Sequence, residues 1–399
     1  MSSTSELKQR VIGAVDTLRA DLIDVANRIH ANPELGFQET AAAKLLTDTL
    51  EGHGLDVERG VAGLDTAFVA TLQGREAGPI IAFLAEYDAL PGLGHACGHN
   101  LIAAAAVGAG LAMRTVLPDL AGEIRVIGTP AEEGGGGKVI MVDAGVFDDV
   151  DAAMMVHPSS RDLIGRKSLT VFHVDIEFFG KAAHAASWPD EGINALDAVI
   201  LTFNGINALR QHMRDDARIH GIITHGGDAP NIIPDHTSAS VLVRALDTPY
   251  ASALLERVRA CAEGAAQATG ARLEFKQAGP RYDARWPNPK LVALAKANFE
   301  TLGVDVALAG ENERMGSSDI GNVSQVVPAI HPYVAIASDE VVGHSPEFRE
   351  AAGSARGHEA MLNAAKALAM TAVDLLAEQD NLREAKQAFE AQKQAQGDV

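Results

Sequence analysis

The sequence predicts an α/β protein with a mixed, largely parallel sheet flanked by helices, interrupted by an inserted α+β domain of ferredoxin-like type. Three observations indicate this class. Apolar strands alternate with helical patterns over residues 1–167, as in βαβ units. Residues 168–282 instead follow the order β-α-β-β-α-β. The first pattern returns over residues 283–399, so the insertion is expected to divide one larger domain.

The first segment opens with helices and continues with strands. Apolar residues recur at helical spacing over 6–31, and Asn32-Pro33 is expected to end that single helix. Residues 101–113 are apolar and rich in Ala and Gly; they are too few to span a bilayer and predict a buried helix. A further helix is expected over about 40–52, and strands over 57–62, 66–72, 79–85, 123–128 and 151–156.

The inserted segment begins with a strand whose residues alternate between apolar and polar. Positions 171–178 alternate as a strand does when one of its faces meets solvent. A helix over about 194–214, strands over 219–224 and 237–244, a helix over 251–269 and a strand over 271–276 complete the unit. Beyond it we expect a helix at 289–302, a strand at 333–337, a helix from about 354 and, after Glu378, a polar helical extension lying on the body.

Composition excludes several classes of protein. The 399 residues carry 33 Lys and Arg against 53 Asp and Glu, a formal charge of −20, so the basic surface of a nucleic-acid-binding protein is not expected. Two cysteines argue against a secreted disulfide framework and favour a cytoplasmic location; Cys261, among alanines on a helix, is expected to serve packing. The first 22 residues carry charges throughout, so neither a signal peptide nor membrane attachment is expected.

Reactive side chains follow the predicted strands, at the ends where parallel sheets hold their sites. A thiolate, imidazoles and carboxylates of this kind form the ligand set of zinc and similar divalent ions. Cys97 and His99 are two residues apart and can reach one centre only from an irregular loop, which Gly94 and Gly98 favour. The candidate residues are Asp88, Cys97, His99, Glu132, Glu133, His157 and His344.

The adjacent glutamates allow a division of labour. One of Glu132 and Glu133 can bind a metal while its neighbour acts as general base, although a solvated pair opening the next helix gives the same pattern. Asp88 can orient a ligand imidazole through the second ring nitrogen or cap a turn, and the residues alone leave both open. Gly134–Gly137 and Lys138 suggest a phosphate loop, but no Ser or Thr follows the lysine, so these glycines are expected to give backbone freedom beside the metal.

Six motifs, in order along nearly the whole chain, resemble those of a known family. The chain is similar to the zinc-type metallopeptidase and amidohydrolase family that includes aminoacylases, carboxypeptidases and dipeptidases. It most resembles the branch with indole-acetyl-amino-acid hydrolase, aminobenzoyl-glutamate hydrolase and β-alanyl-lysine-type dipeptidase, and the dipeptidase-like subgroup within it. The motifs are RIHANPELGF from 28, EYDALPGLGHACGHNL from 86, GTPAEEGGGGK from 128, GKAAHA from 180, PNIIPD from 230 and GHSPEF from 343.

The resemblance implies a zinc-peptidase-like catalytic domain in which the insertion is a lid and dimerisation domain. Glu132 would be the general base, Asp88 would orient the site, and His184 would stabilise the oxyanion from a neighbouring subunit. Asn231 and Arg244 match positions that bind the carboxylate side of the substrate. Two divalent metal ions, expected to be zinc with manganese or cobalt as other candidates, would be held by Cys97, His99, Glu133, His157 and His344.

One departure from the wider family concerns the metal. Most branches place His at the position of Glu86 and a bridging Asp near Cys97. A thiolate favours zinc over manganese, whereas the surrounding histidines accept both, so the identity of the ions stays open. His95 has no implied ligand role and is expected beside the site.

The activity implied is metal-dependent hydrolysis of an amide or peptide bond in a dipeptide or N-acyl amino acid, releasing a free amino acid. The substrate is a small molecule, and a homodimer through the inserted domain is expected. One alternative is an amidase with Cys97 as nucleophile and His99 as base, although two residues so close in a loop rarely face each other. Another is a non-catalytic metal- or ligand-binding relative that keeps the fold.

Overall fold

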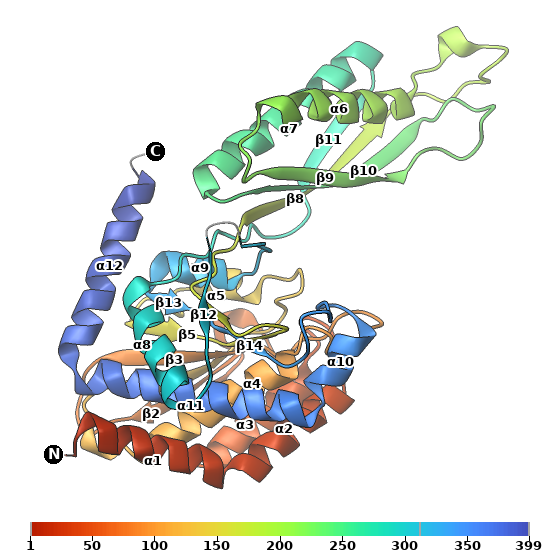
Figure 1. Ribbon diagram of the computed structural model, residues 1–399. Helices are drawn as coiled ribbons and strands as arrows, with labels where there is room; N and C mark the ends of the chain where they lie inside the picture. Colours follow the sequence, from red (N-terminus) through yellow and green to blue (C-terminus); the bar gives the residue numbers. More distant parts are fainter. Residues whose placement is uncertain (1, 311–312, 398–399) are drawn as a thin grey trace. The chain divides into compact units, whose positions relative to one another are not determined.

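The computed structural model describes residues 2–310 and 313–397 and divides into two compact units (Figure 1). Unit 1 comprises Met1–Lys167 and Arg285–Val399, and unit 2 is Ser168–Ala284. The sequence pattern places the inserted segment at 168–282. Each unit has its own hydrophobic core.

Unit 1 is built on a six-stranded sheet with strand order β1-β2-β4-β3-β5-β13. The central strand β3 pairs in parallel with β4 and β5, and β5 pairs in parallel with β13. The β1–β2 and β2–β4 pairs are antiparallel, so the predicted mixed, largely parallel sheet is confirmed. The strands are β1 Asp56–Arg59, β2 Phe68–Gln73, β3 Ile80–Ala85, β4 Glu123–Gly128, β5 Ala152–Met154 and β13 Ala329–Ile330.

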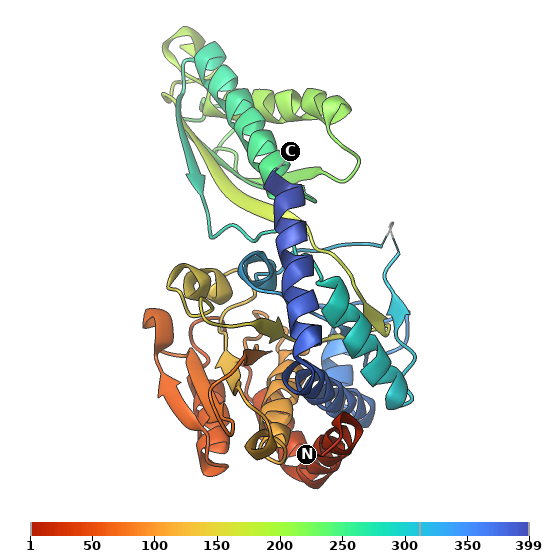
Figure 2. The ribbon, with the colours of Figure 1, turned by 90° about the vertical axis from the view of Figure 1, so that its left-hand side faces the viewer.

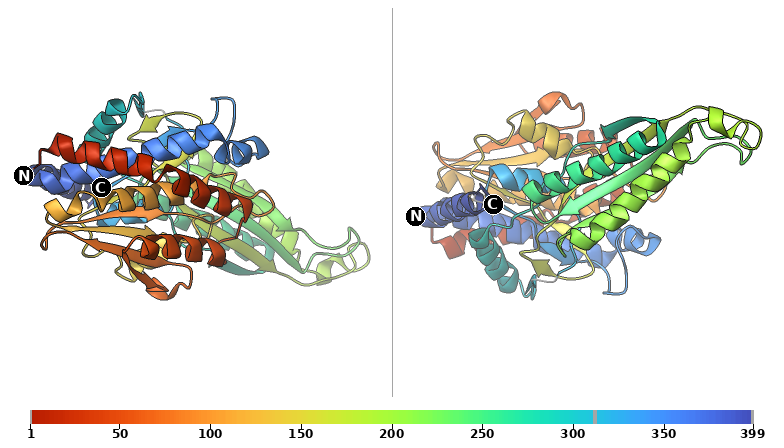
Figure 3. Two further views of the ribbon diagram at one scale, coloured as in Figure 1. Left: turned by 90° about the horizontal axis from the view of Figure 1, so that it is seen from below. Right: turned by 90° about the horizontal axis from the view of Figure 1, so that it is seen from above.

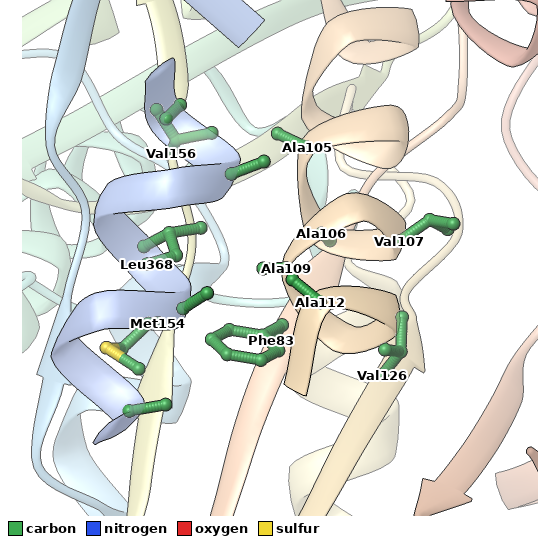
Figure 4. Close-up of a cluster of buried hydrophobic side chains, with 14 of the residues drawn as sticks. Phe83, Ala105, Ala106, Val107, Ala109, Ala112, Val126, Met154, Val156 and Leu368 are labelled. Atoms are coloured by element: carbon green, nitrogen blue, oxygen red, sulfur yellow. The ribbon is translucent and has the colours of Figure 1, made fainter. Parts of the chain in front are cut away.

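Helices cover both faces of this sheet, which explains why β3 is apolar throughout. Phe83 belongs to the core on the side of α4 and α11, whereas Leu84 joins a smaller core with α5 and α9. Figure 4 shows Phe83 reaching between the alanines of α4 and Leu368 of α11. The helices are α1 Thr4–Thr17, α2 Arg19–Ala31, α3 Thr40–Gly52, α4 His99–Met113, α5 Gly137–Asp143, α8 Pro289–Thr301, α9 Ile320–Val326, α10 Pro346–Ala352, α11 Ala355–Ala377 and α12 Gln379–Gly397.

Two boundaries differ from the sequence prediction. The single helix predicted over 6–31 is wrong, because α1 ends at Thr17 and α2 begins at Arg19. Both helices bury apolar side chains against α4 and α11, so the apolar spacing continues across the break (Figure 3, left). The strand predicted over 57–62 ends at Arg59, because Gly60 takes a φ of 71° and starts the 3₁₀ turn Val61–Gly63.

The C-terminal helices close the core of unit 1. Among the described residues α11 is the one helix long and apolar enough to cross a membrane, and 78% of its apolar window is buried in the fold. The predicted helical extension is α12, which leaves the end of α11 in Figure 2 and buries Leu382 and Phe389. A second sheet, ordered β12-β7-β14-β6, consists of β12 Ala307–Leu308, β7 Leu163–Ile164, β14 Tyr333–Ala335 and β6 His157–Ser159.

Unit 2 has the predicted β-α-β-β-α-β order and an antiparallel sheet ordered β11-β8-β10-β9, which is the ferredoxin-like arrangement. Helices α6 and α7 lie side by side on one face of the sheet (Figure 3, right). Cys261 of α7 packs against this core, as expected. The elements are β8 Thr170–Phe179, α6 Ala195–Leu209, β9 Arg218–His225, β10 His236–Ala245, α7 Thr248–Thr269 and β11 Arg272–Gln277.

Candidate metal centre and active site

The loop that carries Cys97 and His99 depends on glycine. Gly94 and Gly98 have φ angles of 73° and 83°, a region that side chains with a Cβ rarely adopt. A Cβ on Gly98 would also lie 2.8 Å from Pro158 Cγ. Glycine therefore brings the loop against the residue that follows His157, and α4 begins directly at His99.

Asp88 orients the site through two hydrogen bonds. Its Oδ1 lies 2.9 Å from His99 Nδ1, and its Oδ2 accepts the backbone N–H of Glu133 at 2.9 Å. The first contact fixes the ring so that Nε2 faces away from Asp88, an arrangement common for histidines that bind metal. Burial opposes the ionised form of Asp88, but the neighbouring His99 and these bonds together lower its pKa. The structure thus favours the orienting interpretation over a turn cap.

The five predicted ligands form two groups that share Cys97. The ligand atoms of Cys97, His99 and His157 lie within 4.8 Å of one another, and so do those of Cys97, Glu133 and His344. Cys97 Sγ is 3.4 Å from His157 Nε2. On the other side, His344 Nε2 is 3.4 Å from Glu133 Oε1. A thiolate between two such groups is placed as a bridging ligand would be.

The donor atoms fit a pair of divalent ions. His99 Nε2 and Glu133 Oε1 are buried and have no hydrogen-bond partner. Leaving a buried polar atom unsatisfied costs about 1–3 kcal/mol, so coordination of a cation is the natural use of these atoms. Sulfur and imidazole ligands beside one carboxylate match the preferences of zinc and related ions.

Glu132 lies beside these ligands, within 4.8 Å of His99 and Glu133 as measured between ligand atoms. It is 9% exposed. Burial first, and then the negative charges of Glu86, Glu133 and Asp319, raise the pKa of Glu132 well above its usual value. A buried carboxyl group whose protonated form is favoured is suited to proton transfer.

Comparison with known proteins agrees with this chemistry. The model of peptidase family M20/M25/M40 matches residues 82–374. The chain belongs to this family. It is 40% identical to the Xaa-Arg dipeptidase of Mus musculus over 395 residues, 94% of this chain and 91% of that protein. It is 31% identical to a p-aminobenzoyl-glutamate hydrolase protein of Escherichia coli K12, over 96% of this chain and 94% of that one.

The solved structures include a similar peptidase. A Bacillus subtilis protein described as a dinuclear metal binding peptidase of the M20 family superposes with a TM-score of 0.71 at 25% identity, covering 91% of this chain and 99% of that one. This M20/M25/M40 peptidase is therefore a metal-dependent hydrolase of amide or peptide bonds. Membership in the family also weighs against the alternatives of a cysteine nucleophile and a non-catalytic relative.

Several residues of the site had no role in the sequence prediction. Lys138, Glu86 and Asp319 form a buried ion-pair cluster next to Glu132. A lysine after four glycines carries no sequence signal for such a contact, and Asp319 is 181 residues away from it. His95 is buried, and its ring stacks 6.3 Å from that of His30.

Glu39 is a further unpredicted residue. Its buried carboxylate accepts the N–H of Ala131 at 2.8 Å and the hydroxyl of Thr66 at 3.0 Å. Ala131 takes a φ of 57°, which is costly for a residue with a Cβ. Glu39 therefore holds the strained turn from which Glu132 projects.

The three predicted residues of unit 2 fall into two places. His184 is exposed, and its Nδ1 accepts the N–H of Ser187 at 3.1 Å. Asn231 lies beside it, because the Asn231 carbonyl accepts the N–H of Ala185 at 3.0 Å. Arg244 is near the far end of β10, roughly 25 Å away at about 3.3 Å per residue. One small carboxylate cannot contact Asn231 and Arg244 of the same chain.

Proposed function

We propose that this protein is a dipeptidase or N-acyl amino acid hydrolase that uses two divalent metal ions. The observation that carries the proposal is the position of Cys97 in two ligand groups at once. His99 and His157 would complete one ion's ligands, and Glu133 and His344 the other's. Zinc is the expected ion because a thiolate and imidazoles dominate the ligand set.

The chain's own residues would manage the proton. When bound, the ions supply Lewis acidity, lowering the pKa of a water molecule and polarising the scissile carbonyl. Glu132 would accept the proton of that water and deliver it to the leaving amine. Asp88 would keep His99 in orientation, and Glu39 would hold the turn before Glu132 in place through Ala131.

The substrate class follows from the relatives over nearly the whole chain. We propose a dipeptide with a basic C-terminal residue, as the name of the mouse relative indicates for that protein. Asn231 and Arg244 would bind the substrate's carboxylate end. An acyl-glutamate is the second candidate, because the Escherichia coli relative is named for such a substrate.

A homodimer through unit 2 would complete the site. Because Asn231 and Arg244 of one chain are too far apart to share a carboxylate, they can meet at one substrate only if they come from two chains. Strand β9 is an edge strand with Ile222 66% and Ile223 44% exposed, a surface suited to burial against a second copy. A cytoplasmic location is proposed on the two unpaired cysteines.

Substitution of the base tests the activity. Glu132→Ala is expected to lower kcat by at least about 100-fold, as loss of a general base does, while metal content by elemental analysis stays that of wild type. Glu359→Ala, at an exposed site on α11, serves as the matched control. Activity is measured on dipeptides ending in Arg or Lys and on acyl-glutamates, before and after chelation and metal return. Unchanged turnover in Glu132→Ala would contradict the assignment.

A further inference from the structure

Three carboxylates beside the metal centre form a pocket of their own. Oxygens of Glu86, Glu132 and Asp319 lie within 4.8 Å of one another. Glu86 and Asp319 are completely buried, and Glu132 is 9% exposed. Buried carboxylate oxygens at this spacing are the ligands that manganese, magnesium and calcium prefer. Three such charges without compensation would cost several kcal/mol each to bury.

A lysine already provides the compensating charge. The Lys138 ammonium binds Glu86 Oε1 and lies 2.9 Å from Asp319 Oδ1, with its side chain 0% exposed. The backbone N–H of the same residue donates to Asp319 Oδ2 at 3.0 Å. The ammonium is thus anchored by its own backbone at the place a bound cation would take. It also acts electrostatically on Glu132.

We propose that Lys138 is the resident cation of this pocket, and that it keeps a divalent ion out and Glu132 out of metal coordination. The inference rests on the proposed role of Glu132 as the general base. A carboxylate that binds a metal has its lone pair engaged and cannot accept a proton from water. The ammonium offers hydrogen bonds and a single charge, so it satisfies Glu86 and Asp319 without taking Glu132 as a ligand. Lys138 is therefore a positioning residue.

Metal counting tests the proposal directly. Lys138→Met keeps the length of the side chain and removes the charge. We expect it to bind one more equivalent of Mn²⁺ than wild type, by elemental analysis after dialysis against the free ion. Its kcat should fall about 100-fold with KM changed less than about threefold, since the base and not substrate binding is affected. Lys366→Met, which removes an ion pair with Asp16 elsewhere in unit 1, is the matched control and should behave as wild type.

A double variant separates charge from packing. Lys138→Met with Asp319→Asn has the same net charge in the pocket as wild type and one carboxylate fewer. It should bind the wild-type number of Mn²⁺ ions and recover part of the lost kcat. If Lys138→Met does not fold, this double variant decides: folding with the wild-type metal number supports the proposal, and failure to fold overturns it.

The result that would overturn the inference is also clear. A folded Lys138→Met protein with the same number of bound Mn²⁺ ions as wild type would show that the lysine excludes nothing. Failure of the proposed function looks different, because wild type would then bind no divalent ion or Glu132→Ala would remain active. The difference in metal number between Lys138→Met and wild type is read independently of both.

Discussion

At the scale of single residues, the site depends on carboxylates that have two different tasks. Cys97, Glu133 and the histidines offer atoms to a metal, whereas Asp88 and Glu39 hold backbone and rings in place. The ligands could be predicted because each follows a strand end in a recognisable motif. Glu39 and Lys138 could not, because their partners are far away in sequence and a lone Glu or Lys has many possible uses.

Asp88→Asn tests the orienting role. Asp88 accepts hydrogen bonds on both oxygens, from the His99 ring and from the Glu133 backbone. An amide presents an NH₂ group to one of these donors, so one bond is lost. Metal affinity should fall about 10–100-fold, as it does when such an outer partner of a ligand histidine is removed. Competition with a chromophoric chelator measures it, with the exposed Asp56→Asn as control. Equal affinities for the two variants would show that Asp88 does not orient His99.

At the scale of elements, apolar periodicity predicted the positions of strands and helices better than their ends. Strand β4 begins and ends at the predicted residues, because its apolar run is bounded by polar and glycine residues. The break at Leu18 between α1 and α2 was missed, since both helices bury the same side and neither Gly nor Pro marks the junction. Helix α4 was predicted as a buried helix of small residues, and every residue in it is buried.

The small residues of α4 have a measurable consequence. Gly110 faces β4, and a Cβ there would overlap Val126 Cγ2. Gly110→Ala should therefore destabilise the protein by about 1–3 kcal/mol, the usual cost of overpacking a core. Gly13 lies within α1 with open space around its Cα. Gly13→Ala should stabilise by about 0.5–1 kcal/mol through helix propensity. Urea unfolding of both variants measures the two signs, and a stabilised Gly110→Ala would refute the close packing of α4 on β4.

At the scale of the whole molecule, the chemistry is divided between two separately cored units. Unit 1 contains all the proposed metal ligands and the base, while His184, Asn231 and Arg244 belong to unit 2. The order of elements in both units followed from the alternation of patterns along the chain. Which copy of unit 2 serves which site does not follow from one sequence, because the three residues carry no information about their partner.

Subunit complementation decides this last point. We expect Glu132→Ala and His184→Ala to be inactive alone, the latter by about 10²–10³-fold through loss of oxyanion stabilisation. The two are then co-expressed with different affinity tags, and the mixed dimer is isolated by both tags in sequence. If His184 acts in the partner's site, the subunit with an intact Glu132 receives an intact His184 from the other subunit. The mixed dimer then has one working site of two and about half of wild-type activity. If His184 acts within its own chain, each site lacks one residue and the mixed dimer stays inactive. Failure to isolate any mixed dimer, with a wild-type mass in solution of 41.8 kDa, would exclude the dimer itself.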